Sequence, residues 1–270
     1  METKVILLGT GTPNIDPERS GPSVAIVVDK SVYVVDFGPG IVRRAIAAGI
    51  KPTSLVRAFL THLHSDHTVG YPDLIFTPAV EGRNEPLEVF GPRGLVNMTQ
   101  YIQEAFKEDI RERFDGLEPA LKRGYVVNAH EIEEGTIYKD DYVEVEAFRV
   151  DHGSLDAYGF KFLTSSKSIV ISGDTCPTPN LIKKSMGCDI LIHEVYSAEG
   201  LSERPDKWIK YHSSVHTSTH ELAEIANKVK PGLLVLYHQL FWKRTEEQLL
   251  AEISEIYNGR IVSGKDLDIF

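Results

Sequence analysis

The sequence has few of the features that mark secreted, membrane-bound or disulfide-stabilised proteins. Only two of its 270 residues are cysteines, Cys176 and Cys188, too few for a disulfide framework and too far apart for a CxxC pair. No apolar run approaches the roughly 20 residues of a membrane-spanning helix. Met1–Lys4 leads straight into an apolar run, which leaves no room for the charged leader of a signal peptide. We therefore expect a cytoplasmic protein with no membrane partner.

An excess of positive charge is also absent. The 29 basic residues are outnumbered by 39 acidic ones, for a formal net charge of -10. Broad, unspecific affinity for nucleic acid depends on many contacts from Lys and Arg to phosphates, so this charge disfavours it, although a local basic patch remains open. No linker, low-complexity tract or repeat interrupts the chain, and residues 1–270 are expected to form a single domain.

Hydrophobic periodicity predicts an α/β protein with strands in two groups, each followed by helices. Apolar runs predict strands near 4–9, 23–29, 31–36, 55–60, 125–132, 142–151, 158–164, 168–172, 189–192 and 233–237. Helical spacing predicts helices near 40–49, from His67 onward, and near 93–122, 218–229 and 246–257.

The densest cluster of metal-binding side chains is the run Thr61–His67 (THLHSDH). Its three imidazoles and one carboxylate exceed what a fold needs for stability. On an extended segment His62 and His64 point to the same side, whereas Asp66 and His67 follow a turn and can reach a second position. The apolar run before them places the cluster at the C-terminal end of a strand, where α/β proteins usually carry their chemistry. The run therefore predicts half of a dinuclear metal site.

Three further candidate ligands also follow predicted strands, namely His152, Asp174 and His238. The H-x-H-x-D-H run and this later set resemble the metallo-β-lactamase superfamily, and the resemblance implies a four-layer αβ/βα sandwich with the site between two sheets. It also implies two ions and a ligand for every position: His62, His64 and His152 on the first ion, Asp66, His67 and His238 on the second, and Asp174 bridging both. Donors that are all nitrogen and oxygen suit two Zn2+ ions and also tolerate Mn2+ or Fe2+.

Two later segments resemble the ribonuclease Z-like enzymes of this superfamily: Leu191–Tyr196 (LIHEVY) and His216–Ala226 (HTSTHELAEIA). In that group a glutamate and a histidine together protonate the leaving oxygen, a role that the resemblance assigns to Glu194 and His216. Ser218 and Glu221 have the spacing of a capping box, which places His216 just before a helix. The implied mechanism is attack by a metal-bridging hydroxide that Asp66 orients, with proton delivery by the Glu194 and His216 pair.

The chain departs from ribonuclease Z in features that those enzymes use for tRNA. The interval between His152 and Asp174 is too short for the protruding arm that many members carry there. Their P-x-K-x-R-N loop corresponds to residues 13–22 (PNIDPERSGP), and their G-D-T-R corresponds to Gly173–Cys176 (GDTC). We therefore expect an armless, arylsulfatase-like relative acting on small anionic esters, with small phosphodiesters favoured over nucleic acid.

Other activities and partners remain open at this point. They are arylsulfatase activity, hydrolysis of carboxylic esters or lactones, tRNA 3'-end processing, and metal binding without turnover. A homodimer through helices around residues 68–122 follows only by analogy with the family.

Some polar and apolar segments are expected to support the fold or the site. Asp36–Gly40 is expected to support the site through a turn and hydrogen bonds. Pro72–Pro78 is interpreted as part of an ordinary core helix or loop in preference to the wall of a substrate pocket. The remaining histidines singled out are expected to be structural or exposed: His130, His193, His212 and His220.

Overall fold

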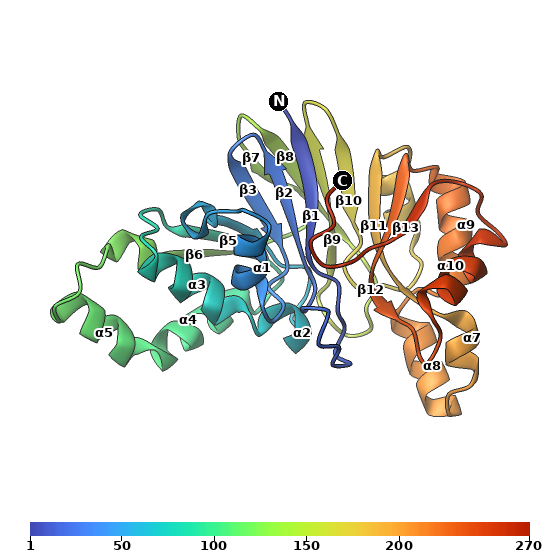
Figure 1. Cartoon of the computed structure of the whole chain (residues 1–270), viewed down its shortest axis with the longest axis horizontal. Helices are drawn as coiled ribbons and strands as arrows, with labels where there is room; N and C mark the ends of the chain where they lie inside the picture. The colour runs from blue at the N-terminus through green and yellow to red at the C-terminus, as the bar shows by residue number, and fades with distance from the viewer.

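Two β-sheets form the centre of the molecule in the computed structural model, which describes all residues from 1 to 270 (Figure 1). The first sheet has the strand order β1-β2-β3-β4-β5-β6, and the second has the order β13-β12-β11-β10-β9-β8-β7. The first comprises β1 (Thr3–Gly9), β2 (Ser23–Val28), β3 (Ser31–Val35), β4 (Arg57–Phe59), β5 (Leu87–Gly91) and β6 (Val127–Glu131). The second comprises β7 (Gly135–Lys139), β8 (Val143–Arg149), β9 (Tyr158–Thr164), β10 (Ser168–Ile171), β11 (Ile190–Tyr196), β12 (Leu233–Leu240) and β13 (Ile261–Ser263).

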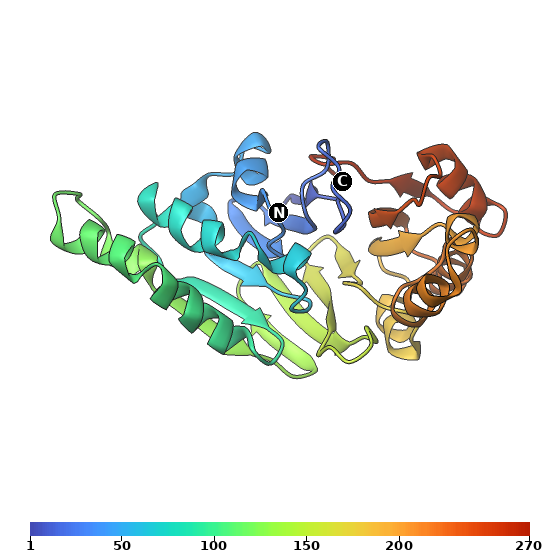
Figure 2. The ribbon, with the colours of Figure 1, turned by 90° about the horizontal axis from the view of Figure 1, so that it is seen from below.

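Helices flank the sheets on opposite sides, with the blue to green helices on one side and the orange and red helices on the other (Figure 2). The first set comprises α1 (Ile41–Ala47), α2 (Ser65–Thr68), α3 (Tyr71–Val80), α4 (Leu95–Ala105) and α5 (Lys107–Asp115). The second comprises α6 (Pro179–Ser185), α7 (Ala198–Ser202), α8 (Asp206–Val215), α9 (Thr219–Val229) and α10 (Glu246–Ser254). None of these helices combines the length and the apolar character needed to cross a membrane. The expected four-layer αβ/βα sandwich is confirmed.

Strand alternation explains why four layers are stable. In β1, Val5 and Leu7 are buried in the core between the two sheets, whereas Ile6 and Leu8 are buried in the core between the first sheet and its helices. In β11, Ile190 and Ile192 likewise face the inter-sheet core, and Leu191 faces the helices of the second half. Strands that are apolar on both faces can be accommodated only where both faces are covered.

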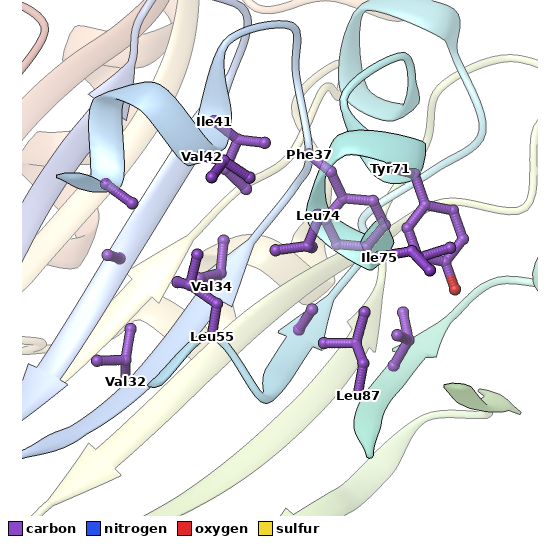
Figure 3. Close-up of a cluster of buried hydrophobic side chains, with 14 of the residues drawn as sticks. Val32, Val34, Phe37, Ile41, Val42, Leu55, Tyr71, Leu74, Ile75 and Leu87 are labelled. Atoms are coloured by element: carbon purple, nitrogen blue, oxygen red, sulfur yellow. The ribbon is translucent and has the colours of Figure 1, made fainter. Parts of the chain in front are cut away.

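The core beneath α1 and α3 fixes the elements that carry the Thr61–His67 run. Phe37, which follows β3, packs its ring 4.9 Å from that of Tyr71 at the start of α3, with Leu74 and Ile75 beside them (Figure 3). Burial of Leu74 and Ile75 confirms the interpretation of Pro72–Pro78 as a core helix. The alternative, a wall of the substrate pocket, is wrong, because no residue of this segment lines the cavity that contains His64, Asp66 and Asp174.

Several element predictions need correction. The helix predicted over 93–122 is two helices, which meet at Phe106, a 41%-exposed residue whose ring lies 4.6 Å from that of Phe76. The apolar run 55–60 contains only the three-residue strand β4. Strands β5, β7 and β13 and helices α6 to α8 were not predicted, because they are short and most are only partly buried.

Candidate metal centre

The predicted ligands come together at one end of the sandwich, between the two sheets. Asp36 follows β3, His62 follows β4, His152 follows β8 and Asp174 follows β10, so four strand ends from both sheets meet there. Carboxyl ends of strands are the usual location for chemistry in α/β proteins. The donor atoms form two close groups, one of His62, His64, His152 and Asp174 and one of Asp66, His67 and His238, each with its atoms within 4.8 Å of one another.

The first group is a set of three converging imidazoles. Nδ1 of His64 lies 3.1 Å from Nε2 of His62 and 3.1 Å from Nε2 of His152. Nδ1 of His152 donates to the carbonyl of Val215 at 2.7 Å, and Nδ1 of His62 contacts Oγ1 of Thr61 at 2.9 Å. These contacts fix the rings of His62 and His152 so that their Nε2 atoms point inward, toward Nδ1 of His64. Burial lowers the pKa of all three imidazoles, so they are neutral and carry lone pairs near pH 7.

The second group is carried by the one-turn helix α2 and by β12. Nε2 of His67 lies 3.5 Å from Oδ2 of Asp66, and Nε2 of His238 lies 3.2 Å from the same oxygen. Nδ1 of His67 donates to Oδ2 of Asp36 at 2.8 Å, and Asp36 also accepts the backbone N–H of Thr61 at 2.8 Å. The predicted supporting role of Asp36 is confirmed, because this buried carboxylate holds both ends of the Thr61–His67 run.

His238 is aimed into the site by a β-bulge. In the pairing of β11 with β12, Glu194 is opposite Tyr237 and Val195 is opposite Gln239, so His238 is the extra residue of the bulge. Its φ of 44° lies in the left-handed region that a non-glycine residue seldom occupies. Such bulges redirect side chains beside functional sites. Nδ1 of His238 has no hydrogen-bond partner, so the backbone of the bulge and the contact of Nε2 with Asp66 orient this ring.

Asp174 lies between the two groups. Its Oδ2 is 3.9 Å from Nε2 of His62 and 3.5 Å from Nε2 of His238, and its Oδ1 is 3.5 Å from Nε2 of His67. The preceding Gly173 has a φ of 62°, and a Cβ there would lie 2.9 Å from the carbonyl oxygen of Tyr158, so only glycine fits this turn. Burial opposes ionisation of Asp174, but the facing charges of His238 and His67 outweigh it and hold its pKa well below the ordinary value.

The donor set fits a pair of cations. Nε2 of His67 and Oδ1 of Asp174 are buried without any hydrogen-bond partner, and the facing imidazole nitrogens of the first group cannot all be satisfied by one another's protons. Donors around a tetrahedral zinc ion, with bonds of about 2.0–2.1 Å, lie roughly 3.4 Å apart. The separations of 3.1 to 3.9 Å within the two groups bracket that value.

Glu194 and His216 form a buried pair beside the second group. Nδ1 of His216 lies 3.2 Å from Oε1 of Glu194, which also accepts the backbone N–H groups of Thr175 and Thr217. His216 precedes α9, whose capping box of Ser218 and Glu221 forms as predicted. Burial raises the pKa of Glu194 well above its ordinary value, with the charge of Asp174 adding to it, and burial lowers the pKa of His216 to about 4. The imidazole of His216 is therefore neutral near pH 7, and the carboxyl of Glu194 holds its proton more strongly than an ordinary glutamate.

A cavity of about 460 Å³ opens onto both groups. Its floor includes His64, Asp66, Asp174, His216 and His238. Its wall is formed by side chains that the sequence analysis did not assign to the site: Arg204, Trp208, Tyr211, Leu240 and Trp242. The signal that could have found the α8 part of this wall is the spacing of aromatic residues at helical intervals in an otherwise polar segment.

The four histidines set aside earlier have different surroundings. His212 was expected to be structural or exposed, but it lies in the wall of the cavity, with its ring 5.6 Å from that of His216. Its position on α8 was not foreseen because that helix was not predicted. His193 is fully buried in β11, and His130 and His220 are exposed, as expected.

Comparisons with known proteins agree with this geometry. The family described as "Beta-lactamase superfamily domain" matches residues 33–239. The chain is 32% identical to a protein of Mycobacterium bovis (strain BCG / Pasteur 1173P2) named ribonuclease Z, over 98% of this chain and 96% of that one. Among solved structures, it resembles the metallo-β-lactamase fold protein YhfI of Bacillus subtilis, with a TM-score of 0.79, 16% identity and full coverage of both chains. It also resembles a diphosphatase of the PhnP family, with a TM-score of 0.69, 20% identity and coverage of 100% and 97%.

Proposed function

This chain belongs to the metallo-β-lactamase superfamily and is a metal-dependent hydrolase of ester bonds, and we propose that its substrates are small phosphodiesters. The observation that carries this proposal is one constellation: seven nitrogen and oxygen donors in two groups, with the buried Glu194 and His216 pair beside them and a cavity above. We also propose that residues 1–270 act as a single domain.

The proposed ligands divide as the two groups do. His62, His64 and His152 would hold one ion, Asp66, His67 and His238 would hold the other, and Asp174 would bridge them. Nitrogen and oxygen donors at this spacing suit Zn2+ best, with Mn2+ or Fe2+ tolerated. When bound, a pair of such ions supplies Lewis acidity, which makes a water molecule nucleophilic near neutral pH and offsets negative charge on the ester oxygens.

Asp66 and the Glu194 and His216 pair would handle the protons. One oxygen of Asp66 is engaged by His238, and the other is available to orient the attacking water at the cavity floor. The one hydrogen bond of the His216 ring to the protein uses Nδ1, so Nε2 can donate a proton to the leaving oxygen. Glu194, whose pKa burial raises well above its ordinary value, faces Nδ1 and is placed to return a proton to it.

The cavity supports a small substrate. Its volume of about 460 Å³ falls in the range of roughly 300–1,000 Å³ that is typical of small-molecule sites. The stretch between His152 and Asp174 contains only β9, β10 and their connections, so no arm extends from it. The PhnP-family neighbour, named a diphosphatase, has the same fold and supports phosphoryl chemistry on a small molecule.

Processing of tRNA 3' ends is the second candidate, and the mycobacterial relative named ribonuclease Z favours it. Because the match covers 96% of that relative, the relative has no large segment that this chain lacks. The absence of an arm therefore does not distinguish this chain from the mycobacterial relative. The net charge of -10 still disfavours a large nucleic-acid surface around the cavity.

A substrate panel on the zinc-reconstituted protein tests the proposal. It comprises bis(p-nitrophenyl) phosphate, p-nitrophenyl sulfate, p-nitrophenyl acetate and a tRNA precursor with a 3' extension. We expect the phosphodiester to be hydrolysed with the highest kcat/KM, and an Asp174→Ala variant to lose that activity. Faster cleavage of the sulfate or the acetate would overturn the phosphodiester assignment, and a higher kcat/KM on the tRNA precursor would favour the second candidate.

A further inference from the structure

Helix α8 presents an aromatic face that the core does not use. Trp208, Tyr211 and His212 are spaced three and four residues apart, so they share one face of the helix. Val215 is the one buried residue of this helix and Ile209 packs against a small apolar cluster, whereas Trp208 and Tyr211 remain 40% and 44% exposed. All three side chains instead line the cavity above the two ligand groups.

A continuous series of rings connects this face to the reacting end of the cavity. The ring of Trp208 is stacked on that of His212 with centroids 5.8 Å apart. His212 lies 5.6 Å from His216, which in turn lies 5.9 Å from His238. A planar group bound against Trp208 would therefore be connected, through the rings of His212 and His216, to the reacting end of the cavity.

Trp242 closes the opposite side of this surface in a strained backbone. Its φ of 41° and that of Lys243, 71°, place two consecutive large residues in the left-handed region. That conformation is unfavourable for residues that carry a Cβ, and it concentrates at functional sites. The centroid of the Trp242 ring lies 4.6 Å from that of His212 and 5.3 Å from that of Tyr196. The strained turn therefore places the indole of Trp242 in the cavity wall.

Arg204 adds a positive charge to the same wall. It lines the cavity just before α8, and its Nε has no acceptor within the protein. A donor left free in this position can serve an anionic group of a ligand. The wall thus combines flat apolar surface with one cationic donor.

We propose that Trp208, Tyr211 and Trp242 form a binding site for a planar aromatic group carried by the ester substrate. The inference rests on the proposed function, because the aromatic group occupies the wall while the phosphoryl group lies over the two ligand groups. Stacking on Trp208 and packing between Tyr211 and Trp242 make this wall the element that selects among esters.

Intrinsic fluorescence offers a direct test, because the chain has two tryptophans and both line this cavity. The zinc-reconstituted protein is titrated with phenyl phosphate and with methyl phosphate, which carry the same anionic group. We expect phenyl phosphate to bind about tenfold more tightly, as one aromatic stack provides. Tyr211→Leu retains both tryptophans and should remove most of this preference. Trp208→Leu, followed through Trp242, should do the same.

The control and a second ligand pair complete the test. Tyr101→Leu changes a 75%-exposed tyrosine on α4, away from the cavity, and should leave both affinities unchanged. Adenosine 5'-monophosphate against ribose 5-phosphate asks whether a nucleobase fills the site as well as a phenyl ring does, and a preference in either pair supports the inference. Equal affinity within both pairs, or a preference that survives Tyr211→Leu and Trp208→Leu, would overturn it.

The outcome is separable from that of the proposed function. Binding is measured without turnover, so a protein that prefers phenyl phosphate but hydrolyses no diester would contradict the function alone. An active phosphodiesterase that shows no preference within either ligand pair would contradict the aromatic site alone.

Discussion

Nδ1 of His216 lies 3.2 Å from Oε1 of Glu194, and both side chains are buried. The contact joins β11 to the residue just before α9, so the fold itself fixes the pair beside Asp174. Burial raises the pKa of Glu194 and lowers that of His216 to about 4. A buried pair with a free Nε2 is arranged to pass a proton to a leaving group.

Replacing His216 should therefore affect substrates according to their leaving groups. His216→Ala is expected to lower kcat about 100-fold or more on a diester with an alkyl leaving group, and less than about tenfold on bis(p-nitrophenyl) phosphate. Nitrophenolate leaves without a proton, whereas an alkoxide does not. The measurement is kcat on both substrates, with the exposed His220→Ala as the control. Equal losses on the two substrates would rule out the proton-donor role.

Asp36 should control metal affinity without touching the metal. Its carboxylate fixes His67 through Nδ1 at 2.8 Å and the strand end through Thr61. Asp36→Asn removes the charge that orients this ring, and the affinity for Zn2+ is expected to fall about 10- to 100-fold. Competition with a chromophoric chelator measures it, with the exposed Asp115→Asn as the matched control. An unchanged affinity would mean that Asp36 serves only the fold.

His193 should make the protein less stable in mild acid. This imidazole is fully buried in β11, and burial lowers its pKa to about 4, against an ordinary value of 6.5. The unfolded chain therefore binds a proton between pH 6.5 and 4 that the folded chain does not. The stabilisation is fully present above pH 6.5, and the free energy of unfolding falls as the pH drops through this window, by at most about 1.4 kcal/mol per pH unit for this residue.

Urea unfolding at pH 7 and pH 5 in the presence of EDTA measures this effect. The loss of stability between the two values should be smaller in His193→Asn than in the unchanged protein, whereas the exposed His220→Asn should match the unchanged protein. If His193→Asn loses as much stability as the unchanged protein, His193 does not contribute to the pH dependence.

Arg83 should be a major determinant of stability. It is fully buried, and its guanidinium donates to the carbonyls of Leu55, Leu74, Ile75 and Gly124. Burial lowers its pKa to about 10, which still leaves it charged at pH 7. Arg83→Met leaves these buried carbonyls without donors, and the free energy of unfolding is expected to fall by about 3 kcal/mol or more. Urea denaturation checks this, and exposed Arg111→Met should change it little; a similarly small effect of Arg83→Met would contradict this assignment.

The parts of the site that could be predicted are those in which chemistry is local in the sequence. His62, His64, Asp66 and His67 stand within one short run, and strand ends in an α/β fold converge, so His152 and Asp174 could be added from their positions. Their geometry now agrees with those roles as ligands, which remain a proposal.

The parts that could not be predicted depend on tertiary structure. The bulge that directs His238 into the site arises from the pairing of β11 with β12, and no residue type in the sequence predicts it. The aromatic wall needs α8, and although Trp208 and Tyr211 have helical spacing in the sequence, that spacing does not say which cavity their face lines. Arg83 is a charged residue whose burial depends on carbonyls contributed by distant segments.

Anomalous diffraction at the zinc edge from crystals of the zinc-loaded protein tests the central claim most directly. The account predicts two peaks per chain, one among His62, His64 and His152 and one among Asp66, His67 and His238, with Asp174 between them. His216 also lies within 4.8 Å of Asp174 and His238, which makes a different site conceivable on the same atoms. A single peak among Asp174, His216 and His238, or no peak at all, would contradict the account.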